Sequence, residues 1–219
     1  MLFHPGEYSD SHSFAPINRH GMREERKDYG KLRVRRSIRM FGRNQATINY
    51  NIVIESVAVT IDGFTVQPDP NYHPFIPHDT AIFANAAMLR VTNCTINADG
   101  CGIAVYGIGS GVIISGNRIN AGEHGIFMSR YGTCGNITYN TITCTRNELE
   151  EPDELDLTCG MCPKLTHTST LRIANNVIDG FLTGIRVDDW LPSLMRLQIK
   201  RANTFTQISD QWVEAHRIT

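Results

Sequence analysis

Short runs with a β-branched apolar residue at every second position recur along the chain, for example Val57, Val59 and Ile61, and Val112 and Ile114. Alternation over four or five residues, with Val and Ile at the apolar positions, is typical of a β-strand that buries one face. No window has apolar residues three and four apart over ten or more positions, as a helical repeat would need. The pattern therefore predicts an all-β chain built from short strands.

One motif within these runs, Ile-x-x-Asn-x-Ile, repeats along the chain. Full copies begin at Ile114, Ile137 and Ile173, and weaker copies begin at Ile61 and Val91. The steps between successive copies are 30, 23, 23 and 36 residues, from the starting positions 61, 91, 114, 137 and 173. The base repeat is therefore 23 residues, and two of the repeats contain extra residues.

A second motif, Gly-Ile-x-Val or Gly-Ile-x-Met, begins at Gly102, Gly125 and Gly184, with a degenerate copy at Ala81. Each of the three full copies starts six residues after the last apolar residue of the first motif, at positions 96, 119 and 178. Strands of four or five residues cannot close a core alone. We therefore expect the repeats to stack as coils of a solenoid, with Ile and Val in continuous interior columns.

The repeats predict a right-handed parallel β-helix of about six or seven coils, forming a single domain over residues 1–219. Parallel strand connections are overwhelmingly right-handed. Proline-containing stretches that interrupt the repeat predict two long insertions, at residues 67–80 and 145–168. Residues 9–31 are predicted to form a polar loop, and residues 203–219 a C-terminal cap or tail.

Three asparagines, Asn117, Asn140 and Asn176, occupy equivalent places after a strand. Asn tolerates the left-handed backbone that a tight corner needs. Amides stacked in register can also hydrogen-bond from one coil to the next. We therefore predict an asparagine ladder at one corner of the solenoid, with a structural role.

These repeats resemble the pectate-lyase-like superfamily of right-handed parallel β-helices, which includes carbohydrate-binding and sugar-hydrolase repeats, over roughly residues 32–205. Residues 2–8, Leu-Phe-His-Pro-Gly-Glu-Tyr, are similar to the Pro-Gly-x-Tyr segment that opens many members, and residues 32–42 to the strand pair that follows it. Members usually carry a capping helix and strand before this point, so we expect a truncated or divergent member or one that borrows its cap from a partner. The fold hosts enzymes, tailspikes and binding modules, and intracellular members of the F-box type are interaction modules.

Charge is distributed unevenly, although the formal net charge is only −1 and gives no reason to expect nucleic-acid binding. Residues 1–45 contain ten Lys and Arg against five Asp and Glu, with Arg33, Arg35 and Arg36 close together. Residues 145–156 are acidic instead. Each stretch is either a solvated surface or a docking patch for a partner.

Membrane and export signals are not found in the sequence. No apolar stretch reaches the roughly 18 to 20 residues that span a bilayer, and the first residues lack the basic start and apolar core of a signal peptide. We therefore expect an intracellular, cytoplasmic protein with no membrane contact. Its six cysteines are irregularly spaced and are expected to be reduced thiols.

Catalytic motifs were sought by comparison with the superfamily that the chain resembles. Polygalacturonases carry Asn-Thr-Asp, Asp-Asp, Gly-His-Gly and Arg-Ile-Lys in this order, whereas here the fragments are incomplete and differently ordered. The candidates that remain are His124, Arg130, Asp188 and Asp189. Glycoside hydrolysis needs paired carboxyl groups about 5 to 9.5 Å apart, and adjacent residues on an extended strand point to opposite sides. The missing motifs favour a non-catalytic protein and leave enzymatic activity as an alternative.

Two further features are candidate binding sites. Cys159 and Cys162 form a Cys-x-x-Cys, a spacing that can hold zinc, but no second pair completes the site, so we interpret them as loop cysteines and predict no cofactor. Phe83 and Phe127 occupy the outward position of the Gly-Ile-x-Val strand. Outward rings can stack on a sugar, pack against a partner or lie under the chain's own 67–80 loop.

Our leading hypothesis is a non-catalytic structural or interaction module that presents its β-helix surface and loops to other proteins of a larger assembly. The alternative is a carbohydrate-binding or polysaccharide-degrading protein, whose ligand would be an oligosaccharide. A third interpretation, a virion or tailspike fragment, predicts a trimer in solution.

Overall fold

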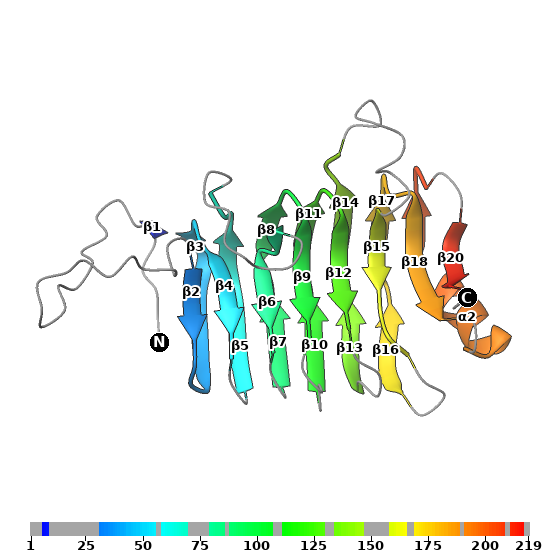
Figure 1. Cartoon of the computed structure of the whole chain (residues 1–219), viewed down its shortest axis with the longest axis horizontal. Coiled ribbons are helices and arrows are strands. Elements are labelled where there is room, and N and C mark those ends of the chain that lie inside the picture. Colours follow the sequence, from blue (N-terminus) through cyan, green and yellow to red (C-terminus); the bar gives the residue numbers. More distant parts are fainter. Residues whose placement is uncertain are drawn as a thin grey trace, which may run out of the picture.

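The computed structural model of the chain is a rod of stacked coils, which follow one another along its longest axis from the N-terminal to the C-terminal end (Figure 1). It describes residues 6–8, 31–55, 58–69, 79–85, 88–106, 111–129, 134–146, 158–165, 169–188, 191–208 and 211–216. Most of the expected 9–31 loop and much of both expected insertions lie outside these residues. Within them, no helix is long and apolar enough to cross a membrane.

An eight-stranded parallel sheet forms one face of the rod, with one strand from each coil. Its strands pair in the order in which they occur along the chain: β2 (Lys31–Val34), β4 (Asn51–Ile54), β6 (Ile82–Ala84), β9 (Cys101–Val105), β12 (His124–Met128), β15 (Cys159–Cys162), β18 (Thr183–Asp188) and β20 (Gln211–His216). Seven of these strands begin a coil and β20 follows the last, which agrees with the predicted six or seven coils.

A twelve-stranded parallel sheet forms the rest of the wall and divides into two limbs that meet at two long strands, β3 (Ile38–Ile48) and β5 (Ala58–Val66). The first limb consists of β7 (Met88–Thr92), β10 (Gly111–Ser115), β13 (Cys134–Thr138) and β16 (Thr170–Ala174). The second limb consists of β8 (Thr95–Ala98), β11 (Arg118–Ala121), β14 (Thr141–Cys144), β17 (Val177–Asp179) and β19 (Thr204–Thr206), and a short strand, β1 (Gly6–Tyr8), pairs with β3. The prediction of a right-handed parallel β-helix is confirmed.

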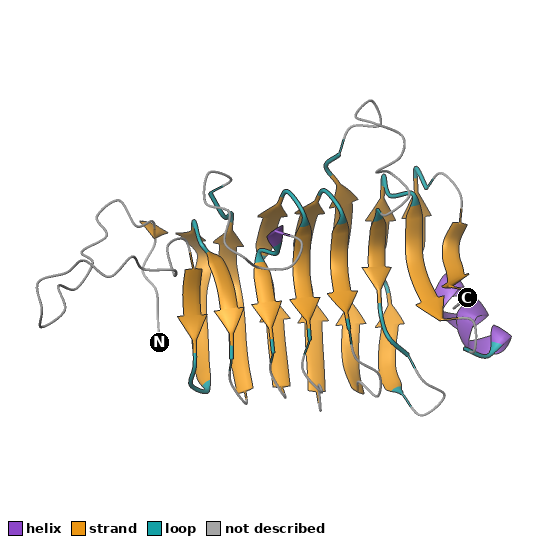
Figure 2. Cartoon of the chain, in the orientation of Figure 1, coloured by secondary structure: helices purple, strands orange, loops and turns teal. Residues whose placement is uncertain are grey.

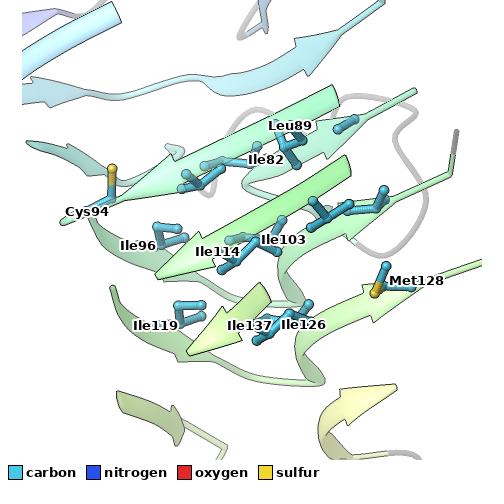
Figure 3. Close-up of a cluster of buried hydrophobic side chains, with 14 of the residues drawn as sticks. Ile82, Leu89, Cys94, Ile96, Ile103, Ile114, Ile119, Ile126, Met128 and Ile137 are labelled. Carbon is cyan, nitrogen blue, oxygen red and sulfur yellow. The ribbon is translucent and has the colours of Figure 1, made fainter. Parts of the chain in front are cut away.

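Columns of apolar side chains fill the interior, because the parallel pairing keeps equivalent residues in register from coil to coil. Ile103, for example, pairs with Ile82 on one side and with Ile126 on the other. These three side chains are completely buried, and Figure 3 shows them beside the columns of the twelve-stranded sheet. Burying one such side chain contributes roughly 1.5 to 3 kcal/mol, so the repeated motifs supply the main stabilising term of the fold.

The predicted asparagine ladder is present at the corner between the two limbs. The side-chain amide of Asn117 donates to Oδ1 of Asn140 (2.9 Å), that of Asn140 to Asn176 (2.9 Å), and that of Asn176 to Asn203 (2.8 Å). Each Oδ1 also accepts the backbone N–H of the preceding member, and the first in the series is Cys94 N to Asn117 Oδ1 (2.9 Å). The ladder therefore satisfies buried polar groups that would otherwise destabilise the corner.

The left-handed backbone that we expected of the ladder asparagines belongs instead to the residue before each of them. Gly116 (φ 68°), Tyr139 (φ 58°) and Asn175 (φ 58°) adopt it, directly before Asn117, Asn140 and Asn176. The chain turns at this position, and the ladder side chain then points inward. The sequence therefore predicted the corner at the right place in the chain. The residue with the left-handed backbone, however, lies one position before the asparagine to which we had assigned that conformation.

Two segments differ from the predicted layout. The range 145–168 contains the regular strand β15, so Cys159 and Cys162 lie in a strand and not in a loop. Residues 193–201 form a helix, α2 (Ser193–Arg201), which Figure 2 shows in purple at the C-terminal end of the rod. The sequence predicted no helix there because α2 spans only nine residues, fewer than the window that we required. The range 203–219 likewise contains β19 and β20, which continue the two sheets.

Candidate functional site

A row of four aromatic rings lies on the outer face of the eight-stranded sheet. The rings of Phe83 and Tyr106 stack at a centroid distance of 4.9 Å, with an interplanar angle of 24°. Tyr106 and Phe127 are 5.7 Å apart and tilted, and Phe127 and His124 stack at 5.7 Å with an angle of 18°. These spacings are those at which aromatic pairs attract one another. The four side chains, which we call the aromatic row, form one connected, partly exposed surface.

The strand register explains how the aromatic row forms. Phe83 on β6 and Phe127 on β12 both pair with Ala104 on β9. Because the side chain of Ala104 is small and fully buried, it leaves room for the ring of Tyr106, which directly follows β9, to lie between the two phenylalanines. The outward position of Phe83 and Phe127 was predicted from the sequence, whereas their connection through Tyr106 was not.

Three cysteines adjoin the aromatic row on the same sheet. His124 pairs in register with Cys101 and Cys159, and Phe127 pairs with Cys162. Burial raises the pKa of Cys101 to about 12. A hydrogen bond with Cys159, followed by burial, raises the pKa of Cys162 well above its ordinary value. Cys101 and Cys162 are therefore neutral thiols at physiological pH, and not the thiolates that act as nucleophiles.

The Cys159 and Cys162 pair was our candidate for a metal site. Among the residues that the structure describes, no group of three or more His, Cys, Asp or Glu side chains has the arrangement needed to hold a metal ion. Both cysteines lie on strand β15, where the Cys159 thiol donates to the carbonyl oxygen of Met161 (3.0 Å).

The four catalytic candidates are only partly described. His124 belongs to the aromatic row, and Asp188 is the last residue of β18. In the strand register, His124 is aligned through Cys159 with Thr183, five residues before Asp188. Five residues along a strand amount to about 16 Å, so this register separates the two candidates. Arg130, Asp189 and the side chain of Asp188 lie outside the described part of the structure.

The basic N-terminal candidates lie around one carboxylate. Nε of Arg35 is 3.3 Å from Oε2 of Glu55, and a guanidinium nitrogen of Arg33 is 3.9 Å from Oε1 of the same residue. Arg36 is exposed beside them. Glu55 therefore offsets part of the positive charge that the sequence showed in this segment.

The first limb carries a groove of about 540 Å³ on its outer face. It crosses five strands, from β3 through β5, β7 and β10 to β13. Its outward column is a mixture of residue types that align in register, namely Arg39, Thr60, Arg90, Ile113 and Asn136. Arg172 on β16 continues this column past the end of the groove.

Sequence reasoning did not find this groove, although a signal for it exists. The column is the residue directly before the first apolar position of each Ile-x-x-Asn-x-Ile motif, as Arg90 is before Val91 and Asn136 before Ile137. Following this position through every copy would have aligned the arginines.

The arrangement of two parallel sheets around one apolar interior, with an asparagine ladder at a corner, defines the parallel β-helix class of proteins. The chain belongs to the right-handed β-helix family, because the model of that family, described as the right handed beta helix region, matches residues 80–211, more than half of the chain. A comparison with curated proteins and one with solved structures found no match. Membership of this family establishes the scaffold and leaves the activity to be argued from its surfaces.

Proposed function

We propose that this protein is a non-catalytic binding module whose aromatic row docks on another protein. The observation that carries the proposal is the continuity of the four rings from β6 to β12. Phe and Tyr contribute large contact areas to protein interfaces, and a phenol or imidazole adds a polar group at the edge. A row of partly exposed rings on a rigid sheet therefore suits the centre of an interface.

The chemistry beside the aromatic row also favours binding over catalysis. The neighbouring Cys101 and Cys162 are held as neutral thiols by their raised pKa values. Arg186 lies on β18, two strands from β12 in the order β12, β15, β18, and is aligned with Glu214 on β20. An apolar centre with a cation at its margin matches a partner surface with an apolar core and an acidic rim.

A photocrosslinking experiment tests this proposal. Phe127 is replaced by photoreactive benzoylphenylalanine in the full chain, expressed in its native source. The matched control carries the same residue at Tyr139, which is 64% exposed at the opposite corner between the limbs. We expect a discrete crosslinked protein from position 127 that is absent from position 139. No crosslinked product at 127, or the same products at both positions, would overturn the proposal.

A second candidate function is supported by the same rings. The near-parallel pair of Phe83 and Tyr106 presents faces of the kind on which sugar rings stack. Incubation with a panel of neutral and acidic polysaccharides tests this alternative. Millimolar or tighter binding that Phe127→Ala abolishes would support it, and neither binding nor cleavage of any member would remove it.

A further inference from the structure

The groove on the first limb differs in chemistry from the aromatic row. Arg39 and Arg90 line it, and none of the described residues that line it is acidic. Both arginines are exposed, as is Arg172 at the end of the same column. Asp62 stands in the next outward column, where its carboxylate accepts hydrogen bonds from Thr92 (2.6 Å) and Asn93 (2.8 Å). The groove therefore presents positive charge to a ligand.

Apolar and neutral polar side chains lie between the arginines. Met88 is 54% exposed at one edge of the groove, and Ile113 follows Arg90 in the outward column. Met adapts its shape to different apolar partners because its side chain is unbranched and flexible. Thr60 and Asn136 supply a hydroxyl and an amide in the same column. A ligand with both acidic and apolar side chains matches this composition.

The coil repeat sets the distances between the arginines. Arg39 and Arg90 are two strands apart in the order β3, β5, β7, and Arg90 and Arg172 are three apart in the order β7, β10, β13, β16. At about 4.8 Å for each strand, these separations are about 10 and 14 Å. An extended peptide advances about 3.1 to 3.4 Å per residue, so they correspond to about three and four residues.

We propose that this groove binds an extended acidic peptide of a partner protein. The peptide lies along the rod, across the strands, with carboxylates spaced i, i+3 and i+7 opposite Arg39, Arg90 and Arg172. An apolar residue between the second and third carboxylates packs on Ile113 and Met88. The proposal rests on the proposed function in taking the partner to be a protein, and it uses a different face of the rod.

Fluorescence anisotropy with the full chain tests the groove. The probe is a labelled twelve-residue peptide with Glu at positions 3, 6 and 10, Leu at position 8 and small neutral residues elsewhere. A control peptide of the same composition has its three Glu at positions 3, 4 and 5. We expect the first peptide to bind at least about five-fold more tightly, and its affinity to fall as salt is raised.

Variants locate the binding surface. We expect Arg90→Gln and Arg172→Gln each to weaken binding about five-fold or more. Arg118→Gln, at an exposed arginine on β11 of the second limb, is the matched control and should change affinity less than about two-fold. Equal binding of the two peptides, or equal weakening by Arg118→Gln and Arg90→Gln, would overturn the proposal.

Two further measurements separate this proposal from its alternatives. Phe127→Ala should leave peptide binding unchanged, and loss of binding in this variant would assign the peptide to the aromatic row instead. Oligogalacturonate that binds more tightly than the peptide would replace the proposed ligand with an acidic sugar. If the peptide fails while position 127 still crosslinks to a protein, the groove proposal is wrong and the proposed function stands.

Discussion

Two adjacent columns on the first limb show how this protein divides structure from function. The inward column of Ile61, Val91, Ile114, Ile137 and Ile173 contains only branched aliphatic residues, which are 4% exposed or less. The outward column, one residue earlier on the same strands, contains Thr60, Arg90, Ile113, Asn136 and Arg172. Each inward residue meets the same surroundings in every coil, whereas each outward residue lies on the surface of the rod. Regularity therefore marks the scaffold, and variation marks the surface on which binding can be built.

The largest effect should come from breaking the ladder. Asn140→Ala removes the oxygen that accepts hydrogen bonds from the backbone N–H and the side-chain amide of Asn117. It also removes the amide that donates to Oδ1 of Asn176 and to the carbonyl oxygen of Ile114. Because the partners stay buried, we expect a loss of about 4 kcal/mol in the free energy of unfolding. Urea denaturation followed by circular dichroism measures it. Asn136→Ala, on the outward column, is the control and should change stability by less than about 0.5 kcal/mol. Comparable losses in the two variants would contradict the division between columns.

The glycines of the second motif offer the next test. A Cβ at Gly125 would lie 2.5 Å from the carbonyl oxygen of Gly160 and would overlap Cγ2 of Ile142. We therefore expect Gly125→Ala to destabilise the protein by about 3 kcal/mol. A Cβ at Gly111, on the outer face, would meet only Met88 Cγ at 4.0 Å. Thermal unfolding of Gly111→Ala should accordingly resemble that of the wild type, and equal shifts in both variants would count against the clash.

A smaller effect is expected from two neighbouring isoleucines. Ile114 is fully buried and Ile113 points outward. Ile114→Val removes one buried methylene and should lower the free energy of unfolding by about 1 kcal/mol. Ile113→Val should change it by about 0.2 kcal/mol, because that side chain leaves no cavity behind. The same denaturation experiment compares the two, and a larger loss at Ile113 would reverse their assignment.

The smallest effect should be a gain. Tyr139 holds a left-handed backbone (φ 58°) with a side chain that is 64% exposed. Tyr139→Gly relieves this strain while losing little buried area, so we expect a stabilisation of about 0.5 kcal/mol. Thr141→Gly, two residues later on strand β14, should instead destabilise by about 1 kcal/mol. Loss of stability at both positions would show that the corner is not strained.

The fold could be predicted because the interior repeats the same physical requirement in every coil. Ile137 and Asn140 occupy the positions that Ile114 and Asn117 occupy one coil earlier. Each copy of the motif therefore supports the prediction of a strand and a corner at the next copy. Where one copy departs from the pattern, prediction failed. Gly160 fills the glycine position of the second motif, but Met161 and Cys162 follow it, and the strand was assigned to an insertion.

The last coil was missed for a related reason. Asn203 completes the ladder, yet the residue three positions before it, Lys200, belongs to helix α2 instead of a strand. The residues around Asn203 do not match the Ile-x-x-Asn-x-Ile motif, so the sequence did not identify Asn203 as a fourth member of the ladder. The candidate surfaces could be predicted only in part, because Tyr106 and the outward arginines become neighbours of other coils only once the register is known.

The ladder also has a direction and an end. Each bond between two ladder side chains runs from the amide of one asparagine to Oδ1 of the asparagine in the next coil. The last amide, on Asn203, donates instead to the carbonyl oxygens of Ile199 in α2 (2.7 Å) and Ile173 (3.1 Å). A rod of this kind can change length by internal duplication or deletion, since removal of one 23-residue unit between Asn117 and Asn140 would join equivalent partners. Growth beyond Asn203 would first have to displace the helix. In evolution, such a rod can therefore gain or lose whole coils. Each added coil would increase the distance between the surface charges on either side of it by one strand spacing.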